Sequence, residues 1–402
     1  MSAPEDRLRD AYRAVADTID PATVASPLGS THRPATSSRW TRILTPLAAA
    51  AAVAAIVVIT TTLGSGKPAG HHPRTSSPRH HSRTSKTKHP MTAAKLPEFT
   101  LVDLGSSVKV YNTRTGADVA TLAPPAGQQF EDVATAGTGR TFLAATSRPA
   151  PACYAYFYRF QLTAAGQPSP PTFLRSVPGS LPTAITGVPS GRGYAYSTTG
   201  CSTTIPGGVG ISGRAGNRTW NYPAADDYAF SLASTADGRT LALSFGIYGN
   251  GPGTGFQNML LNTKSRSHTA AGASRILSTV PVSVTLAISP DGRKLYACTS
   301  DGTAGTLAAY STATGAQIQV LHQWPVTGSG GGAPGTSSGY DSRGFSCQIS
   351  TDPTGRYLIA AVNFDNNDDH WALTGFDLHT GAFAKIPIRL GHLPLLGSQL
   401  AW

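Results

Sequence analysis

Residues 286–300, LAISPDGRKLYACTS, carry the pattern that decides the fold of this chain. An aliphatic residue followed by a small one begins an apolar run, Gly-Arg follows six residues later, and a second apolar run comes next. This order predicts a strand, a tight turn and a returning strand, with the glycine at a positive φ. The pattern recurs around five glycines: Gly139, Gly191, Gly238, Gly292 and Gly355.

The residues that flank these glycines repeat as well. Six residues before each glycine stands an aliphatic residue, from Val133 in the first unit to Ile349 in the last, and the next residue is small. A large apolar residue stands three positions after each glycine. Successive glycines are 52, 47, 54 and 63 residues apart. A period of about 50 residues with strand-like sequence predicts a propeller or a solenoid.

The two ends of the repeat region complete one another. Most units contain a second glycine turn, as at Gly315, so each unit offers about four strands. Thr115-Gly116 is a second turn with no first turn before it, whereas Leu400-Ala401 is an aliphatic-small pair with no turn after it. We therefore expect an all-β propeller of six four-stranded blades, closed by pairing residues 395–402 with residues 98–122. A solenoid would instead need capping repeats.

Three segments resemble the strand-turn motifs of WD-like, YVTN-type and TolB-type propellers: LAISPDGRKLYACTSD, LASTADGRTLALS and VKVYNTRTGADVATL. The resemblance covers residues 98–402, and it is to the superfamily because an Asp precedes the turn glycine only at Asp237 and Asp291. The layout of a short helix, an Ala-rich span, a stalk and a propeller resembles membrane-anchored propeller proteins of actinobacteria. This resemblance implies a fold and a location outside the cytoplasm.

The N-terminal region predicts a membrane anchor. Residues 4–20 have the spacing of an amphipathic helix within a cytoplasmic segment, residues 1–42. Residues 43–63 carry no charge and are long enough to cross a bilayer as one helix. A cleaved signal peptide is the alternative, but its charged leader would be unusually long. Because all four cysteines follow the span, we expect the N-terminus inside and residues 96–402 outside.

The positive charge of the chain lies mainly outside the predicted propeller. Residues 64–95 are rich in Pro, His and Ser and predict a flexible stalk. Within it, residues 67–95 contain seven Lys/Arg and no acid, whereas residues 96–402 contain 19 Lys/Arg and 16 acids. The propeller is therefore close to neutral, which argues against binding to nucleic acid.

The four cysteines are spaced by about one repeat. Cys153 and Cys201 are 48 residues apart, and Cys298 and Cys347 are 49 apart, so each pair could join neighbouring blades. We expect disulfides Cys153–Cys201 and Cys298–Cys347, although four cysteines allow three connectivities and four reduced thiols are an alternative.

We expect no catalytic residue, cofactor site or metal site at three further motifs. Residues 335–339 fit GxSxG but lie in a Gly-rich insertion with no following helix. Residues 365–370 are acidic, yet their spacing matches no calcium loop, so a solvated turn is expected. The aromatic residues of 154–158 predict a core strand with an inter-blade contact, with a carbohydrate platform as the alternative.

These observations favour a membrane-tethered, extracytoplasmic and non-enzymatic binding or scaffold module. Its expected partners are the membrane and a protein or cell-envelope ligand. One alternative is a transmembrane regulator whose N-terminal helix binds a cytosolic partner such as a sigma factor. Another is a surface enzyme with its site at the propeller channel, because fold alone does not give function.

Overall fold

The computed structural model describes residues 96–402 apart from several gaps: 138, 149–152, 192, 203–204, 214–215, 225–226, 248–254, 301–303, 326–345, 364–370 and 391–399. The predicted helix 4–20, membrane span 43–63 and stalk 64–95 lie outside the described residues, as do motifs 335–339 and 365–370. Within the part that is described, no helix is long and apolar enough to cross a membrane.

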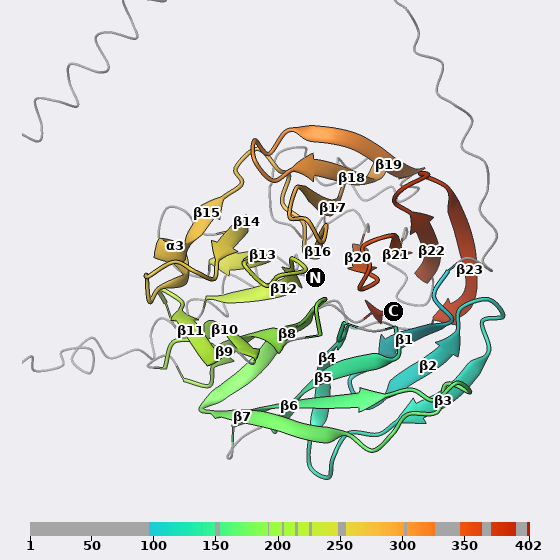
Figure 1. The fold of residues 1–402 in the computed structure, drawn as a ribbon, viewed down its shortest axis with the longest axis horizontal. Coiled ribbons are helices and arrows are strands. Elements are labelled where there is room, and N and C mark those ends of the chain that lie inside the picture. Colours follow the sequence, from blue (N-terminus) through green and yellow to red (C-terminus); the bar gives the residue numbers. More distant parts are fainter. Residues whose placement is uncertain are drawn as a thin grey trace, which may run out of the picture. The chain divides into compact units, whose positions relative to one another are not determined.

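The described residues form six antiparallel four-stranded sheets, arranged as blades around a central axis (Figure 1). From the inner to the outer strand, blade 1 contains β24 (Leu400–Ala401), β1 (Phe99–Asp103), β2 (Val108–Asn112) and β3 (Asp118–Leu122). Blade 2 contains β4 (Gln129–Thr135), β5 (Thr141–Arg148), β6 (Tyr154–Gln161) and β7 (Thr172–Pro178). Blade 3 contains β8 (Ser180–Val188), β9 (Gly193–Gly200), β10 (Gly208–Gly213) and β11 (Gly216–Asn221).

The other three blades follow the same order. Blade 4 contains β12 (Tyr228–Ser234), β13 (Thr240–Ile247), β14 (Gly255–Asn262) and β15 (Ser274–Ile276), with the single-turn helix α3 (Ala270–Ala273) before β15. Blade 5 contains β16 (Leu286–Ile288), β17 (Lys294–Ser300), β18 (Ala304–Ser311) and β19 (Gln317–Pro325). Blade 6 contains β20 (Ser346–Thr351), β21 (Tyr357–Asn363), β22 (Trp371–Asp377) and β23 (Phe383–Leu390). Six four-stranded blades were predicted, and this prediction is confirmed.

The turn between the first two strands of a blade depends on glycine, as the sequence pattern indicates. Gly191, Gly238, Gly292 and Gly355 have φ values between 66° and 72°. Gly139 is an exception, because its φ is not positive and Gly137 takes the positive φ of 75° in that turn. A Cβ on Gly137 would lie 2.6 Å from the Cα of Gly191, so close approach to the next blade fixes glycine there. The expectation for Gly139 was therefore wrong.

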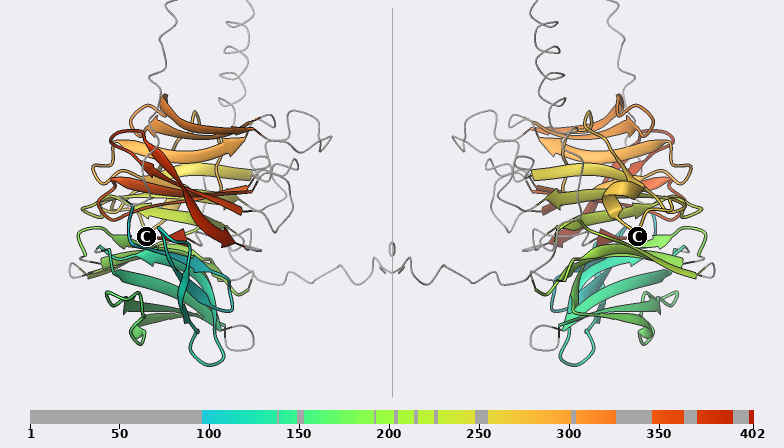
Figure 2. Two further views of the ribbon diagram at one scale, coloured as in Figure 1. Left: turned by 90° about the vertical axis from the view of Figure 1, so that its right-hand side faces the viewer. Right: turned by 90° about the vertical axis from the view of Figure 1, so that its left-hand side faces the viewer.

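Buried apolar side chains lie between the blades. Among the described residues, each pair of neighbouring blades shares one cluster of them. The fully buried Phe142 and Phe160 belong to the cluster between blades 1 and 2, and Trp220 belongs to that between blades 3 and 4. In the side views of Figure 2, the sheets of successive blades lie face to face. Burial of each large side chain contributes about 2–3 kcal/mol.

Two consecutive positions on each inner strand point in opposite directions, because side chains alternate between the two faces of a strand. The aliphatic residue, such as Val133, packs toward the preceding blade. The residue before it points the other way and, in three blades, accepts a hydrogen bond from the backbone N–H of the next blade's aliphatic residue. The N–H of Ile185 donates to the Asp132 carboxylate at 2.7 Å, that of Leu286 to the Ser231 hydroxyl at 3.0 Å, and that of Ile349 to the Thr285 hydroxyl at 3.1 Å.

Two disulfides also join neighbouring blades. Cys153 pairs with Cys201 between blades 2 and 3, and Cys298 pairs with Cys347 between blades 5 and 6. Their Cα atoms are 6.4 and 6.1 Å apart, within the range that a disulfide spans. No cysteine is left free, so the pairing is the one that the repeat-length spacing favoured.

The ring is closed by the last strand of the chain. Leu400 of β24 pairs with Val102 of β1, and Ala401 pairs with Leu101. Strand β24 is therefore the inner strand of blade 1. Trp402 is fully buried, and its indole N–H donates to the Thr100 hydroxyl at 2.9 Å. The predicted closure is confirmed, and it removes the open strand edges that an incomplete ring would expose.

Trp402→Ala should therefore destabilise the whole domain. We expect the free energy of unfolding to fall by about 3–5 kcal/mol, because the substitution leaves a cavity between blades 6 and 1 and removes the bond to Thr100. Denaturant titration measures this loss. Phe173→Ala, on the exposed side of blade 2, is the control and should change stability by less than about 0.5 kcal/mol. Equal effects of the two substitutions would contradict closure through β24.

Candidate functional site

The clearest cavity in the described part of the chain lies on the propeller axis. Its volume is about 540 Å³, including the open mouth, and the inner strands of all six blades line it. The aliphatic-small pairs of the repeat form most of the wall: Val133-Ala134, Ile185-Thr186, Leu232-Ala233, Leu286-Ala287 and Ile349-Ser350, together with Leu400. The small residue of the repeat is thus explained by the narrowness of the channel.

The channel opens where the inner strands reach their turns, at a surface that we call the channel mouth. Gly137, Pro189 and Pro353, which follow inner strands β4, β8 and β20, line the cavity there. Backbone hydrogen bonds join adjacent turns: Ser190 N–H donates to Ala236 O at 3.3 Å, and Ala236 N–H donates to Pro290 O at 2.9 Å. These bonds link the turns of blades 3, 4 and 5 to one another.

The wall of the channel combines apolar side chains with hydroxyl and backbone groups. Asp352 is the one acidic or basic residue among the described residues that line the cavity. Its carboxylate accepts hydrogen bonds from the backbone N–H groups of Tyr357 at 2.7 Å and Thr354 at 3.2 Å. Because these bonds fix the turn of blade 6, this carboxylate has a structural role.

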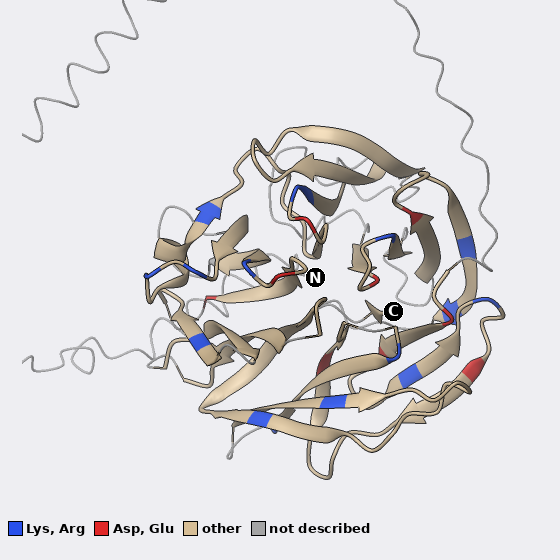
Figure 3. Cartoon of the chain, in the orientation of Figure 1, with Lys and Arg blue, Asp and Glu red and all other residues tan. Residues whose placement is uncertain are grey.

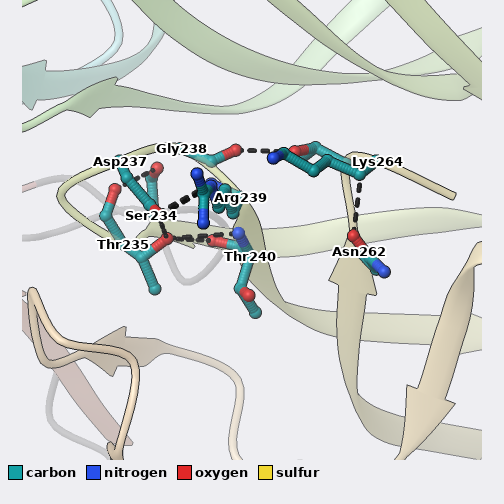
Figure 4. Close-up of polar contacts among 9 residues, drawn as sticks. Ser234, Thr235, Asp237, Gly238, Arg239, Thr240, Asn262 and Lys264 are labelled. Atoms are coloured by element: carbon teal, nitrogen blue, oxygen red, sulfur yellow. Dashed lines mark hydrogen bonds and ion pairs between the residues drawn. The ribbon is translucent and has the colours of Figure 1, made fainter.

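The blade 4 turn shows how such a turn is built (Figure 4). The Asp237 carboxylate accepts hydrogen bonds from the Arg239 N–H at 3.0 Å and from the Thr235 hydroxyl at 2.9 Å. Partial burial raises the pKa of Asp237, but these hydrogen bonds outweigh it and lower the pKa below its usual value. The backbone carbonyl of Arg239 accepts from the N–H of Thr263, which ties the turn to the outer strands.

The arginines of the repeat surround the channel mouth, and each described one has an acidic partner. The pairs are Arg140–Glu98 at 3.1 Å, Arg239–Asp237 at 3.1 Å, Arg293–Asp291 at 3.9 Å and Arg356–Asp377 at 3.4 Å. Arg192 lies outside the described residues. The described part of the mouth therefore presents balanced charge. Three of the pairs are exposed and contribute little stability, whereas Asp377 in the fourth is buried.

A second group of polar residues lies between blades 1 and 2. Asp103 is buried, one of its carboxylate oxygens accepts the Gly105 N–H at 2.7 Å, and the other has no hydrogen-bond partner among the described residues. Burial raises the pKa of Asp103 to about 7, the bond from Gly105 opposes this, and the charge of Glu131 adds to it. Burial, together with the charge of Asp103, raises the pKa of Asp132 well above its usual value.

The predicted site residues fall into two groups in the structure. The turn glycines come together at the channel mouth, whereas the four cysteines lie in blade-to-blade disulfides away from it. In the aromatic strand, Phe157 is buried toward blade 3 and Tyr154 is partly exposed. The described residues contain no group of three or more His, Cys, Asp or Glu that could hold a metal.

The acidic pair was missed by sequence reasoning. Asp132 stands directly before the aliphatic-small pair Val133-Ala134, a position that the repeat comparison could have singled out. Nothing in the sequence marks Asp103, because its burial depends on the closure of blade 1 beside blade 2.

The buried Asp103 should make stability depend on pH. Its raised pKa means that the native state holds a proton that the unfolded chain releases, so stability is highest in mild acid and falls as pH rises through about 7. We expect the free energy of unfolding to fall by about 2–4 kcal/mol between pH 5 and pH 8. Asp103→Asn keeps the acceptor for Gly105 and should reduce this fall, as measured by urea titration at each pH. Asp118→Asn, which is exposed on β3, should leave it unchanged. An identical pH dependence in Asp103→Asn and the original chain would contradict this assignment.

Comparisons with known proteins give the fold alone. No family model and no curated protein matches the chain. Similar solved structures include TolB from Acinetobacter baumannii (TM-score 0.47, 13% identity), for which the match covers 76% of this chain and 65% of that chain, less than two thirds of its length. The periplasmic gluconolactonase PpgL of Pseudomonas aeruginosa (TM-score 0.41, 15% identity) is matched over 71% of this chain and 81% of that chain. A putative 6-phosphogluconolactonase from Bacteroides fragilis (TM-score 0.40, 14% identity) is matched over 76% and 85%. These values carry no argument about this chain, whose propeller fold is established by its own strands.

Proposed function

We propose that this chain is a membrane-tethered, extracytoplasmic propeller that acts as a non-enzymatic binding or scaffold module. The observation that carries this proposal is the channel mouth. Adjoining turns make a ring-shaped surface there, with an aliphatic wall inside it and paired charges around it. A surface of this kind offers shape and scattered polar contacts to a partner, which suits recognition.

Two further observations support the location. Both disulfides join blades, and disulfides persist in oxidising compartments outside the cytoplasm. The uncharged residues 43–63 precede the propeller in the sequence and have the length of a bilayer-spanning helix. The partners that fit this arrangement are the membrane itself and a protein or cell-envelope ligand.

Deletion of residues 43–63 tests the tether. We expect the full chain to stay in the membrane pellet after an alkaline carbonate wash, with no thiol that reacts before reduction. The deleted chain should be soluble and should contain reactive thiols, because it would remain in the reducing cytoplasm. Deletion of residues 64–84 removes the same length from the stalk and should leave the chain in the pellet. Extraction of the full chain by carbonate would contradict the tether.

A photo-crosslinking residue tests the binding surface. Placed at Arg293, whose side chain is 86% exposed at the channel mouth, it should give a discrete adduct on intact cells. Placed at Ile318, which is 52% exposed on the outer strand β19, it should not give that adduct. An adduct of equal yield from both positions, or none from Arg293, would argue against recognition at the mouth.

A further inference from the structure

Two arginines lie together on the face of blade 2 that packs against blade 3. Arg159 of β6 is opposite Leu143 in the sheet, and Arg175 of β7 is opposite Phe157. Leu143 and Phe157 belong to the apolar cluster between blades 2 and 3. Because residues directly opposite each other in a sheet share a face, both arginine side chains point toward blade 3.

Tyrosine hydroxyls face these arginines from blade 3. The guanidinium carbon of Arg175 lies 5.1 Å from the centre of the Tyr196 ring. Burial raises the pKa of Tyr194, while its bond to Ser212 and the charges of Arg175 and Arg159 partly offset that rise. The register places Arg159 and Arg175 on adjacent strands and on the same face of the sheet, so their side chains are neighbours there. Together these five side chains form what we call the arginine–tyrosine site.

No described carboxylate forms an ion pair with either arginine; Asp132 of β4 also faces blade 3, but its two carboxylate oxygens accept the backbone N–H groups of Val133 and Ile185. Strands β6, β7, β8, β9, β10 and β11 contain no Asp or Glu, and Figure 3 shows blue but no red on β6 and β7. Neither arginine has an ion-pair partner among the described residues, unlike the described arginines at the channel mouth. In addition, Nε of Arg159 and Nη1 of Arg175 are buried donors without a hydrogen-bond partner in the described part.

A bound oxyanion would balance the two positive charges and would accept hydrogen bonds from the donors that have no partner. Two partly buried like charges repel each other, and buried donors without acceptors destabilise a protein. A water molecule could accept the hydrogen bonds, but it could not balance the charge. Guanidinium groups bind phosphate oxygens through paired, charge-assisted hydrogen bonds, and tyrosine hydroxyls can donate to the remaining oxygens.

We propose that the arginine–tyrosine site between blades 2 and 3 binds a phosphate group, held by Arg159 and Arg175 with hydroxyl donors from Tyr194 and Tyr196. The phosphate can belong to a free ion, a soluble ester or a lipid headgroup, since all three present the same oxygens. The site is separate from the channel mouth and does not depend on the membrane tether. Both arginines are only partly buried, so a ligand can reach them from solvent.

Thermal unfolding of the purified full-length chain tests this site. Four buried tryptophans of the propeller report unfolding by fluorescence: Trp220, Trp324, Trp371 and Trp402. Sodium phosphate should raise the unfolding midpoint by about 2–4 °C relative to sodium chloride of the same ionic strength, because a ligand that binds only the native state stabilises it. The rise should grow with the logarithm of the phosphate concentration.

Variants separate binding from a structural role. Arg159→Gln and Arg175→Gln should each abolish the response to phosphate, and in chloride they should unfold at or above the original midpoint because one like charge is gone. Arg389→Gln, which removes an exposed arginine on β23, is the control and should keep the full response. Midpoints that drop equally in both salts would show that the arginines only pack against Tyr196, and would overturn the proposal.

Two further arms identify the source of the phosphate. Phosphatidylglycerol in mixed micelles, if it stabilises the chain but not the two variants, assigns the site to lipid headgroups, with micelles of the same neutral detergent alone as the comparison. A response to inorganic phosphate alone assigns it to a free phosphate or a soluble ester. If neither inorganic phosphate nor phosphatidylglycerol stabilises the chain, the proposal is overturned. A response that persists when Arg159→Gln and Arg175→Gln are combined would also overturn it.

Discussion

The pairing of β24 with β1 is the constraint on which the other features of the propeller depend. Without it, blade 1 would have three strands and an exposed inner edge, and the cluster between blades 6 and 1 would lose Leu400 and Trp402. The channel would also lose part of its wall, because Leu400 lines it. A propeller blade is held by both neighbours, so loss of one interface weakens the support of the next. Two residues of β24 therefore have an effect much larger than their number suggests.

Closure also explains why the repeat keeps three kinds of residue side by side on each inner strand. The middle residue packs on the preceding blade, and the residue after it lines the narrow channel. The residue before it can bond to the following blade. These roles hold only if every blade has two neighbours. Where a blade departs from the pattern, contact with the neighbouring blade determines which residue the turn can hold. At Gly137, the close approach of Gly191 leaves no room for a Cβ.

Charge is distributed unevenly between the blade interfaces. At the channel mouth, the described arginines have acidic partners, and the surface is close to neutral. Between blades 1 and 2, burial raises the pKa of Asp103 to about 7. Between blades 2 and 3, Arg159 and Arg175 have no ion-pair partner among the described residues, and the Asp132 carboxylate on this side of β4 bonds to the backbone N–H of Ile185. In a nearly neutral domain, such local imbalances are the places where a proton or an ion can bind with a measurable effect on stability.

The architecture of the domain could be predicted from the sequence. The strand-turn-strand pattern is local, so counting its repeats and matching the half-units at the two ends was enough to predict six blades, their closure and disulfides one repeat apart. The tertiary structure alone decided which polar residues became partners. Asp132 bonds to Ile185 in the next blade, and Trp402 bonds to Thr100 at the other end of the chain. Likewise, Arg159 and Arg175 share a face only through the register of β6 and β7. These contacts arise from the packing of neighbouring sheets. Burial and charge balance at an interface depend on both of its surfaces, whereas a repeat pattern in the sequence describes one blade at a time.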